Sequence, residues 1–354
     1  MDDLQLLREM RSDIGSPAAA TLARGRTELM ARIYSTSTSL GSKDRDTKST
    51  VTPIRFRRRM LLASAAAALL VGGIVVADVV RPTGSGATAE AAEVLNNAAT
   101  ATIKTSDPVV GPGQYLKIET TELTGGGMQA ADGSDISWQE TTGGQLYIPT
   151  DINGEWVWNR EDRVPLGSSS DAAKAAAAEL AQRRQAQPEG GPVLVGILRA
   201  TGGAFYGNEP TIIVGTPLKE ASSLPRDPQA LLDIIYERTK GAGKSPEIKA
   251  LGTITAALRT GVIPADLRAA LYKAAALIPG VTVADKQATI DGRTGVAIGI
   301  PSPDGGSRQE TIIDPATGLL IGERNVLLKD YPGYTAGTIV TWTSVRTSVV
   351  DGAP

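Results

Sequence analysis

The pattern of apolar and polar residues divides the chain into a polar N-terminal stretch, one long apolar segment and a larger mixed region. Within residues 1–34 apolar residues recur at helical spacing, which predicts two short amphipathic helices. Their apolar stripes consist of Leu4, Leu7, Met10, Leu22, Leu29 and Ile33. Helices of this size cannot bury such stripes alone, so we expect them to dock on a partner, lie on a membrane or stay partly unfolded. Residues 35–59 are rich in Ser, Thr, Gly and charged residues, which is typical of a flexible linker.

The apolar segment begins at Met60 and reads MLLASAAAALLVGGIVVA, without a charge. A helix over residues 60–80 would be roughly 30 Å long, the thickness of the hydrocarbon core of a bilayer. The cluster directly before it contains Arg55, Arg57, Arg58 and Arg59. Because cytoplasmic flanks of membrane helices are enriched in Lys and Arg, the pattern predicts a single-pass protein of the cell membrane with its N-terminus in the cytoplasm. Residues 81–354 would then be extracytoplasmic.

Two other interpretations of the apolar segment stay open. The Arg-Arg-Arg-Met-Leu-Leu stretch resembles a twin-arginine signal, and Ala87-Thr88-Ala89 resembles a cleavage site. However, the stretch before the apolar segment is longer than in most signal peptides. A buried Ala-rich helix of a soluble protein is the second alternative, and it would leave the basic cluster unexplained.

The mixed region, residues 90–354, follows a short linker over 81–89 and alternates strand-like and helical stretches. Helices are expected over 91–102, 171–187, from 228 onward, and over 247–259 and 264–277. Strands are expected over 115–121, 136–140, 145–148, 155–160, 281–284, 288–290, 296–300, 310–313, 319–325 and 338–350, and Gly125–Gly127 predicts a loop. The order of strands, helices and strands predicts an α+β domain with helices packed on an antiparallel sheet.

The composition excludes much of the common enzyme chemistry. The chain has no Cys and no His, so it lacks thiol nucleophiles, His general bases and the usual zinc ligands. Gly243-Lys244-Ser245 resembles the end of a phosphate-binding loop, but Arg238 stands where that motif requires its first Gly. We therefore expect no catalytic residue, no metal site and no cofactor.

Charge is distributed unevenly along the chain. Residues 1–59 hold 12 Lys and Arg against 7 Asp and Glu, whereas the remainder holds 24 against 31. The densest basic run directly adjoins the apolar segment, so membrane topology explains it better than nucleic-acid binding. The sequence therefore predicts contact with a lipid bilayer and none with nucleic acid.

Aromatic residues are the main candidates for a ligand site. Trp156 and Trp158 fall on one face of a predicted strand, where they would either line a cavity or pack against the helices. Tyr115 is a further candidate, and Trp138 and Trp342 are weaker ones.

Glu161 and Asp162 are the one pair of adjacent carboxylates that could serve as acid and base. They follow a predicted strand and have an arginine on each side. Such a setting favours a solvated turn over an acid/base pair, because nothing in the pattern indicates burial that would raise a pKa.

Several segments carry a family resemblance: the opening LQLLREMR from Leu4 to Arg11, the apolar segment with its basic flank, GQYL at 113–116, IPGV at 278–281 and IDPATGL at 313–319. On these residues the chain resembles a family of actinobacterial single-pass membrane proteins. Its outer part also resembles the lipoprotein-carrier superfamily and related envelope-stress regulators, which implies a half-barrel-like sheet around helices with an apolar cavity. The tail is similar in placement to that of anti-sigma factors, and the missing Cys and His imply a version without zinc.

Together these features predict a non-enzymatic, membrane-anchored sensor or binding module. The outer domain would bind an apolar or envelope ligand, and the tail would contact a cytoplasmic regulatory protein such as a sigma factor. One alternative is an anchored lipid or lipoprotein carrier without signalling. Another is an extracytoplasmic enzyme that uses carboxylates or Ser and Lys.

Overall fold

The computed structural model describes residues 86–105, 107–130, 133, 135–166, 170–185, 195–331 and 334–354. All of these belong to the second of two compact units, Val76–Pro354. Several sequence predictions lie outside the described residues: the tail 1–34, the linker 35–59, the membrane segment 60–80, most of the linker 81–89, the docking residues Leu4, Leu7, Met10, Leu22, Leu29 and Ile33, and the basic cluster Arg55, Arg57, Arg58 and Arg59. No helix in the described part is long and apolar enough to cross a membrane.

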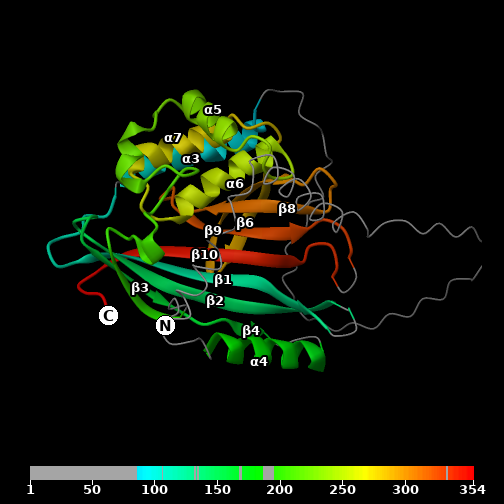
Figure 1. Ribbon diagram of the computed structural model, residues 1–354. Helices are drawn as coiled ribbons and strands as arrows, with labels where there is room; N and C mark the ends of the chain where they lie inside the picture. The colour runs from blue at the N-terminus through cyan, green and yellow to red at the C-terminus, as the bar shows by residue number, and fades with distance from the viewer. Residues whose placement is uncertain are drawn as a thin grey trace, which may run out of the picture. The chain divides into compact units, whose positions relative to one another are not determined.

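The unit is an α+β domain, as the sequence predicts (Figure 1). Its elements are α3 (Ala89–Thr105), β1 (Tyr115–Gln129), β2 (Asp135–Pro149), β3 (Glu155–Arg160), β4 (Val164–Leu166), α4 (Asp171–Gln185), β5 (Gly196–Thr201), the 3-10 helices η1 (Phe205–Gly207) and η2 (Leu218–Ser223), α5 (Pro228–Arg238), α6 (Pro246–Arg259), α7 (Ala265–Ala276), β6 (Thr282–Ile290), β7 (Arg293–Pro301), β8 (Ser307–Ile313), β9 (Leu320–Leu327) and β10 (Ile339–Val350). The described strands form one antiparallel sheet in the order β5-β3-β2-β1-β10-β9-β8-β7-β6, and β4 pairs with β2.

The predicted loop at Gly125–Gly127 is wrong, because these glycines continue β1. They pair with Ser137, Trp138 and Gln139 of β2, so that the strands expected over 136–140 and 145–148 form one long strand. A Cβ atom at Gly126 would collide with the indole of Trp138. The glycines are therefore extended and leave room for a neighbouring aromatic side chain.

Two of the helices begin at the caps that the sequence indicates. Asp227 accepts a hydrogen bond from the Ala230 amide at 2.8 Å at the start of α5, and Ser245 accepts one from the Ile248 amide at 3.2 Å at the start of α6. A proline follows each cap at the first helical position, where its missing N–H costs nothing. These caps fix the starts of both helices within one residue of their predicted positions.

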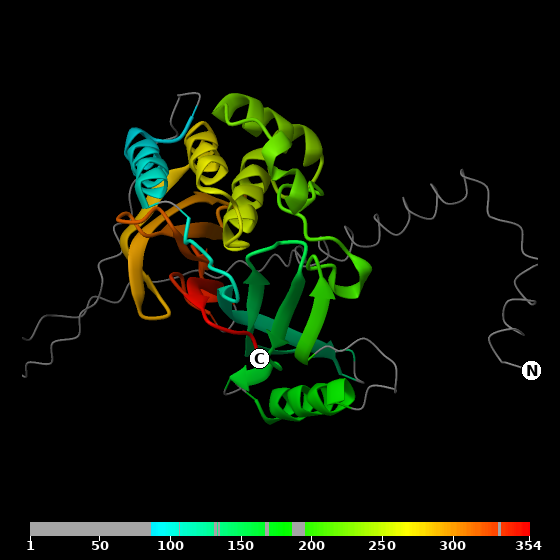
Figure 2. The same ribbon diagram turned by 90° about the vertical axis from the view of Figure 1, so that its left-hand side faces the viewer.

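The larger core lies between the sheet and α3, α5, α6 and α7, which gather at one end of the sheet while α4 lies apart from them (Figure 2). Fully buried side chains meet there from each of the four helices and from the sheet, among them Leu95, Leu231, Ile254, Leu271 and Ile298. Each such side chain stabilises the fold by about 1.5 to 3 kcal/mol relative to an exposed position. The buried hydroxyls of Thr255 in α6 and Thr311 in β8 lie 2.6 Å apart, which ties this helix to the sheet.

The opposite face of the sheet carries a smaller core made of Ala288, Ile290, Ala297, Ile312 and Ile321. Glu310 of β8, on the same face as Ile312, is fully buried, and its carboxylate accepts hydrogen bonds from Arg308 at 2.8 Å and from Arg324 at 2.7 Å. Arg324 stands directly opposite Glu310 on β9. Because a shifted register would remove Arg324 from this buried carboxylate, the pair favours the observed register.

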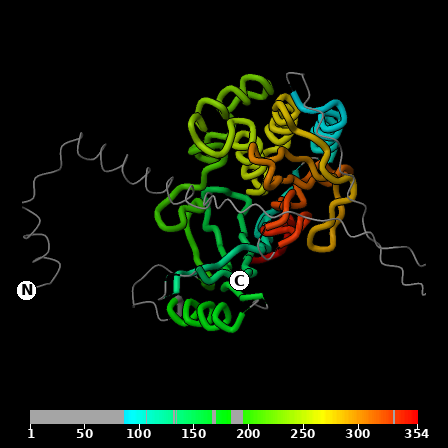
Figure 3. Tube along the Cα trace, turned by 90° about the vertical axis from the view of Figure 1, so that its right-hand side faces the viewer, coloured from blue at the N-terminus to red at the C-terminus, as the bar shows by residue number. Residues whose placement is uncertain are grey.

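The C-terminal residues end beside the edge strand β5, where Arg199 donates a hydrogen bond to the carbonyl of Pro354 (Figure 3). At the other end of the domain α3 packs on α7 and on the turn between β8 and β9. In that turn the carbonyl of Gly318 accepts a hydrogen bond from Thr102 at 3.0 Å. Gly318 has a φ of +69°, and a Cβ atom there would collide with the backbone of α3.

Replacing Gly318 tests whether this close approach holds α3 in place. Alanine at a left-handed position costs about 1 to 2 kcal/mol. At Gly318 the collision with α3 adds a further cost of about 1 to 3 kcal/mol. The free energy of unfolding should therefore fall more for Gly318→Ala than for Gly292→Ala, and the difference should equal this added cost. Gly292 is a matched control because its φ is +70° and nothing lies within 4 Å of its added Cβ. Denaturation of the full chain, followed by tryptophan fluorescence, measures both, and equal losses would contradict the packing role.

Candidate functional site

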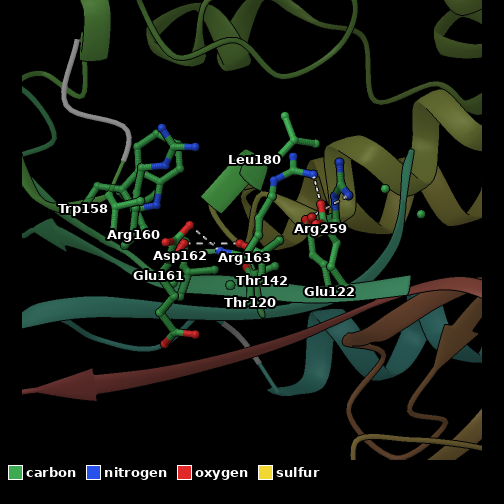
Figure 4. Close-up of a pocket in the computed structure, with 18 of the residues that line it drawn as sticks. Thr120, Glu122, Thr142, Trp158, Arg160, Glu161, Asp162, Arg163, Leu180 and Arg259 are labelled. Atoms are coloured by element: carbon green, nitrogen blue, oxygen red, sulfur yellow. Dashed lines mark hydrogen bonds and ion pairs between the residues drawn. The ribbon is translucent and has the colours of Figure 1, made fainter. Parts of the chain in front are cut away.

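A hollow of about 880 Å³ opens on the sheet face that also carries the helices (Figure 4). It lies between α6 and α4, over β1, β2 and β3. Its described lining consists of Ile118, Thr120, Glu122, Gly125, Gly126, Gly127, Trp138, Glu140, Thr142, Gly143, Gly144, Leu146, Trp158, Arg160, Glu161, Asp162, Arg163, Leu180, Val195, Ala256, Arg259 and Thr260. This size lies within the usual range for small-molecule sites, about 300 to 1,000 Å³.

Small residues form the floor of the hollow. Thr120 of β1 pairs with Gly144 of β2, and Thr142 stands next along the same face. At Gly144 a Cβ atom would lie 2.5 Å from the carbonyl oxygen of Asn159 on the neighbouring β3, so only glycine fits there. The floor therefore offers hydroxyls and bare backbone in place of side chains that would fill the space.

A buried carboxylate stands at the α4 end of the hollow. Glu140 is 2% exposed, and it accepts hydrogen bonds from the indole nitrogen of Trp138 at 3.1 Å and from Arg163 at 2.5 Å. Trp138 in turn packs against Ala173 and Ala177 of α4. Glu140 thus links Arg163, which lies between β3 and β4, to Trp138, against which α4 packs.

The wall formed by β3 contains a stack of aromatic and cationic side chains. The guanidinium carbon of Arg160 lies 4.6 Å from the centroid of the Trp158 ring. Trp158 also meets Phe205 of η1 edge to face, with ring centroids 5.3 Å apart and planes at 63°. Arg160 donates a hydrogen bond to the hydroxyl of Tyr206 at 2.8 Å. Figure 4 shows Trp158 and Arg160 together at one end of the site.

The opposite wall carries Arg259 of α6. Its guanidinium lies 3.0 Å from the carboxylate of Glu323 on β9 and 3.9 Å from that of Glu122 on β1. In Figure 4 Arg259 and Glu122 lie together at the end opposite Trp158. The cation on this wall is thus shared between two carboxylates.

The adjacent carboxylates Glu161 and Asp162 take part in separate hydrogen bonds. Glu161 accepts from the side chain of Gln145 at 2.7 Å, and Gln145 lies on the sheet face away from the hollow. Asp162 accepts from the amide of Arg163 at 2.7 Å. This arrangement favours the turn interpretation over an acid/base pair.

The aromatic candidates from the sequence are placed in different environments. Trp158 lines the hollow. Trp156, on the same strand face, is 3% exposed, belongs to the larger core and donates to the carbonyl of Ile152 at 2.8 Å. Tyr115 lies at the start of β1 and lines neither this hollow nor a smaller hollow beside Trp156. Trp138, a weaker candidate, does line the larger hollow.

A smaller hollow of about 150 Å³ lies beside Trp156, between the turn before β3 and the start of η2. Lys219 and Glu209 line it and form an ion pair at 2.7 Å. The hydrogen bond that the Lys219 ammonium donates to Glu209 raises the pKa of Lys219 above its usual value. Both side chains are exposed, so the pair contributes little to stability.

Metal binding finds no support in the described residues, which hold no group of three Asp, Glu, His or Cys placed to bind an ion. No protein-family model and no curated protein sequence matches the chain. The functional argument therefore rests on the residues of the site itself.

The buried carboxylate gives a stability test of the site. Glu140→Ala should lower the free energy of unfolding by about 1 to 3 kcal/mol, because the indole N–H of Trp138 loses its acceptor. Glu140→Gln keeps an acceptor oxygen and should cost less. Glu155→Ala, which removes an exposed ion pair with Arg199, is the control and should cost no more than about 1 kcal/mol. Equal losses for Glu140→Ala and Glu155→Ala in denaturation curves would show that Glu140 does not hold the site together.

Proposed function

We propose that this protein is a membrane-anchored, non-enzymatic binding module whose large hollow takes an envelope ligand. In this proposal residues 60–80 form a single transmembrane helix, residues 1–34 contact a cytoplasmic regulatory protein, and residues 90–354 bind the ligand outside the membrane. The sheet would act as a half-barrel-like wall around the ligand. The observation that carries the proposal is the hollow of about 880 Å³ on the sheet face between α6 and α4.

The chemistry of the lining supports binding over catalysis. Of the four carboxylates in the described lining, those of Glu122, Glu140 and Glu161 interact with arginine or amide side chains, and that of Asp162 accepts a hydrogen bond from a backbone amide. A general acid or base needs a proton-transfer position within reach of substrate, and paired carboxylates of this kind serve structure more readily. Apolar side chains at both ends of the hollow, Ile118 and Leu180, favour a ligand with an apolar part.

The ligand site can be tested by filling the hollow. Thr120→Phe would place an aromatic ring over the floor, whereas Thr121→Phe, on the opposite face of the same strand, leaves the hollow open. We expect small molecules that co-purify with the full chain from membranes to fall at least about tenfold with Thr120→Phe, since tenfold corresponds to ~1.4 kcal/mol of binding. Mass spectrometry of extracted material measures this. Identical material from the native chain and both variants would refute the site.

Variants of the tail distinguish the sensor hypothesis from the alternative of a carrier without signalling. Leu7→Asp together with Leu29→Asp would place charges on both predicted apolar stripes, so a partner that docks there should be lost. Affinity capture with the full chain, native against double variant, should recover a transcription or signalling protein only with the native tail. Ligand binding unchanged by the double variant, with no partner captured by either form, would favour the carrier.

A further inference from the structure

Arg160 differs from the other arginines that line the hollow. Arg163 is paired with Glu140, and Arg259 with Glu323. Among the described residues, the partners of the Arg160 guanidinium are the ring of Trp158 and the hydroxyl of Tyr206, both uncharged. Within the described part of the chain, this guanidinium therefore forms no ion pair, unlike those of Arg163 and Arg259.

The surroundings hold this guanidinium in position. Phe205 packs edge to face on Trp158 and so supports the ring over which Arg160 lies. Tyr206 reaches Arg160 from a backbone with φ 57° and ψ 26°, a left-handed conformation that is strained for a bulky residue. Such strain is maintained where the surrounding structure requires the side chain in one place. The arginine is therefore preorganised by two elements, β3 and η1.

The position of Arg160 suits recognition of an anion. Stacking on an indole occupies the face of a guanidinium and leaves N–H groups at its edge for hydrogen bonds. The planar fork matches the oxygens of a carboxylate or phosphate. Across the strand pair, Gly144 stands opposite Arg160 without a side chain, and Thr120 and Thr142 add hydroxyls to the floor beside it.

The neighbouring carboxylates do not neutralise this charge. Glu140 is held by Trp138 and Arg163. Glu161 accepts from Gln145, which lies on the sheet face away from the hollow, and Asp162 accepts from the backbone amide of Arg163. A neutral ligand that covered the guanidinium would bury a charge without compensation, which is costly. An anionic group on the ligand removes that cost.

We propose that the ligand of the hollow carries an anionic group, a carboxylate or a phosphate, which Arg160 binds while the apolar part of the ligand contacts Ile118 and Leu146 toward α6. This inference rests on the proposed function, since it names the chemistry that the same hollow selects. Trp158 and Tyr206 are positioning residues that orient the guanidinium.

The test compares three eight-carbon probes that differ in their head groups: octyl phosphate, octanoate and octyl glucoside. The full chain is placed in lipid nanodiscs, and empty nanodiscs correct for partition of the probes into lipid. All four tryptophans lie within the binding domain, so their fluorescence reports binding. We expect an anionic probe to bind at least about tenfold more tightly than octyl glucoside, and the stronger of octyl phosphate and octanoate identifies the head group.

Variants of Arg160 separate recognition from folding. Arg160→Gln should abolish the preference for the anionic probe while octyl glucoside binding changes little. Arg160→Lys keeps the charge without the fork and should retain part of the preference. Arg346→Gln, which alters an exposed arginine of β10 outside the hollow, should leave the preference intact. Because each variant is judged by the ratio of two probes, a general loss of stability does not imitate the expected result.

Two outcomes would overturn the inference alone: equal binding of all three probes by the native chain, or an anion preference that survives in Arg160→Gln. In both cases a hollow that still loses its probes with Thr120→Phe would keep the proposed function. Absence of any probe binding, or binding that Thr120→Phe does not affect, would overturn the proposed function together with the inference.

Discussion

Alternation along two long paired strands is the constraint on which the rest of the domain depends. β1 and β2 pair without interruption from Tyr115 opposite Pro149 to Gln129 opposite Asp135. Every second residue therefore faces the same side over the whole length of the pair. On that side apolar residues such as Leu116 pack under the main helices, and Met128 packs near α4. Thr120 and Glu122 lie between them and line the hollow. The single face thus divides into two covered ends and an open middle.

The middle stays open because its residues are small and because the helices stop at its borders. Threonines and glycines on the floor leave space, and Arg259 in the last turn of α6 marks one border. At the other border α4 contributes only small buried residues, Ala173, Ala176 and Ala177, which sit against Trp138. A sheet face of this length would need larger side chains to close by packing alone. The hollow is thus a consequence of side-chain size on a continuous strand pair.

Charged side chains can line this space because several of them form ion pairs within the protein. Glu140 is almost completely buried, and an isolated carboxylate in that position would be strongly unfavourable. Its bonds to an indole N–H and to Arg163 satisfy both oxygens. The guanidinium of Arg160 is instead stabilised by an aromatic face, which attracts a cation without cancelling its charge. The hollow therefore contains one guanidinium paired with a buried carboxylate, that of Arg163, and one that lies on an aromatic ring, that of Arg160.

Local signals in the sequence predicted the elements better than they predicted the site. Caps such as Asp227 and alternation such as that of β3 depend on neighbours in the chain, and both were confirmed. Gly125–Gly127 was wrongly predicted to be a loop, because the benefit of glycine there comes from Trp138 on another strand. Trp156 and Trp158 were both predicted as cavity candidates. Trp158 lines the larger hollow, whereas Trp156 belongs to the larger core and lines only the smaller hollow. Periodicity alone cannot separate two residues on the same strand face, because their burial depends on which distant segments pack against each one.

Arg160 could have been found from the same alternation, since it is two residues beyond Trp158 and shares its face. Its partner Tyr206 comes from a distant turn with a left-handed backbone, and no local pattern indicates such a contact.

A sensor needs a binding site and also a structural connection from that site to the start of the domain. The packed helices form such a connection. α6 lines the hollow with Ala256, Arg259 and Thr260, packs on α7 and is bonded to β8 through Thr255. α7 in turn packs on α3, the first helix of the domain, which the turn at Gly318 clamps from the other side. A ligand transmits information to α3 through this path only if it binds two arrangements of α6 with different affinity. Arg259 is the residue at which such a difference would arise, because its guanidinium lies between Glu122 on the hollow floor strand and Glu323 on β9. A ligand that displaced one of these carboxylates would shift the balance of the pair and with it the end of α6.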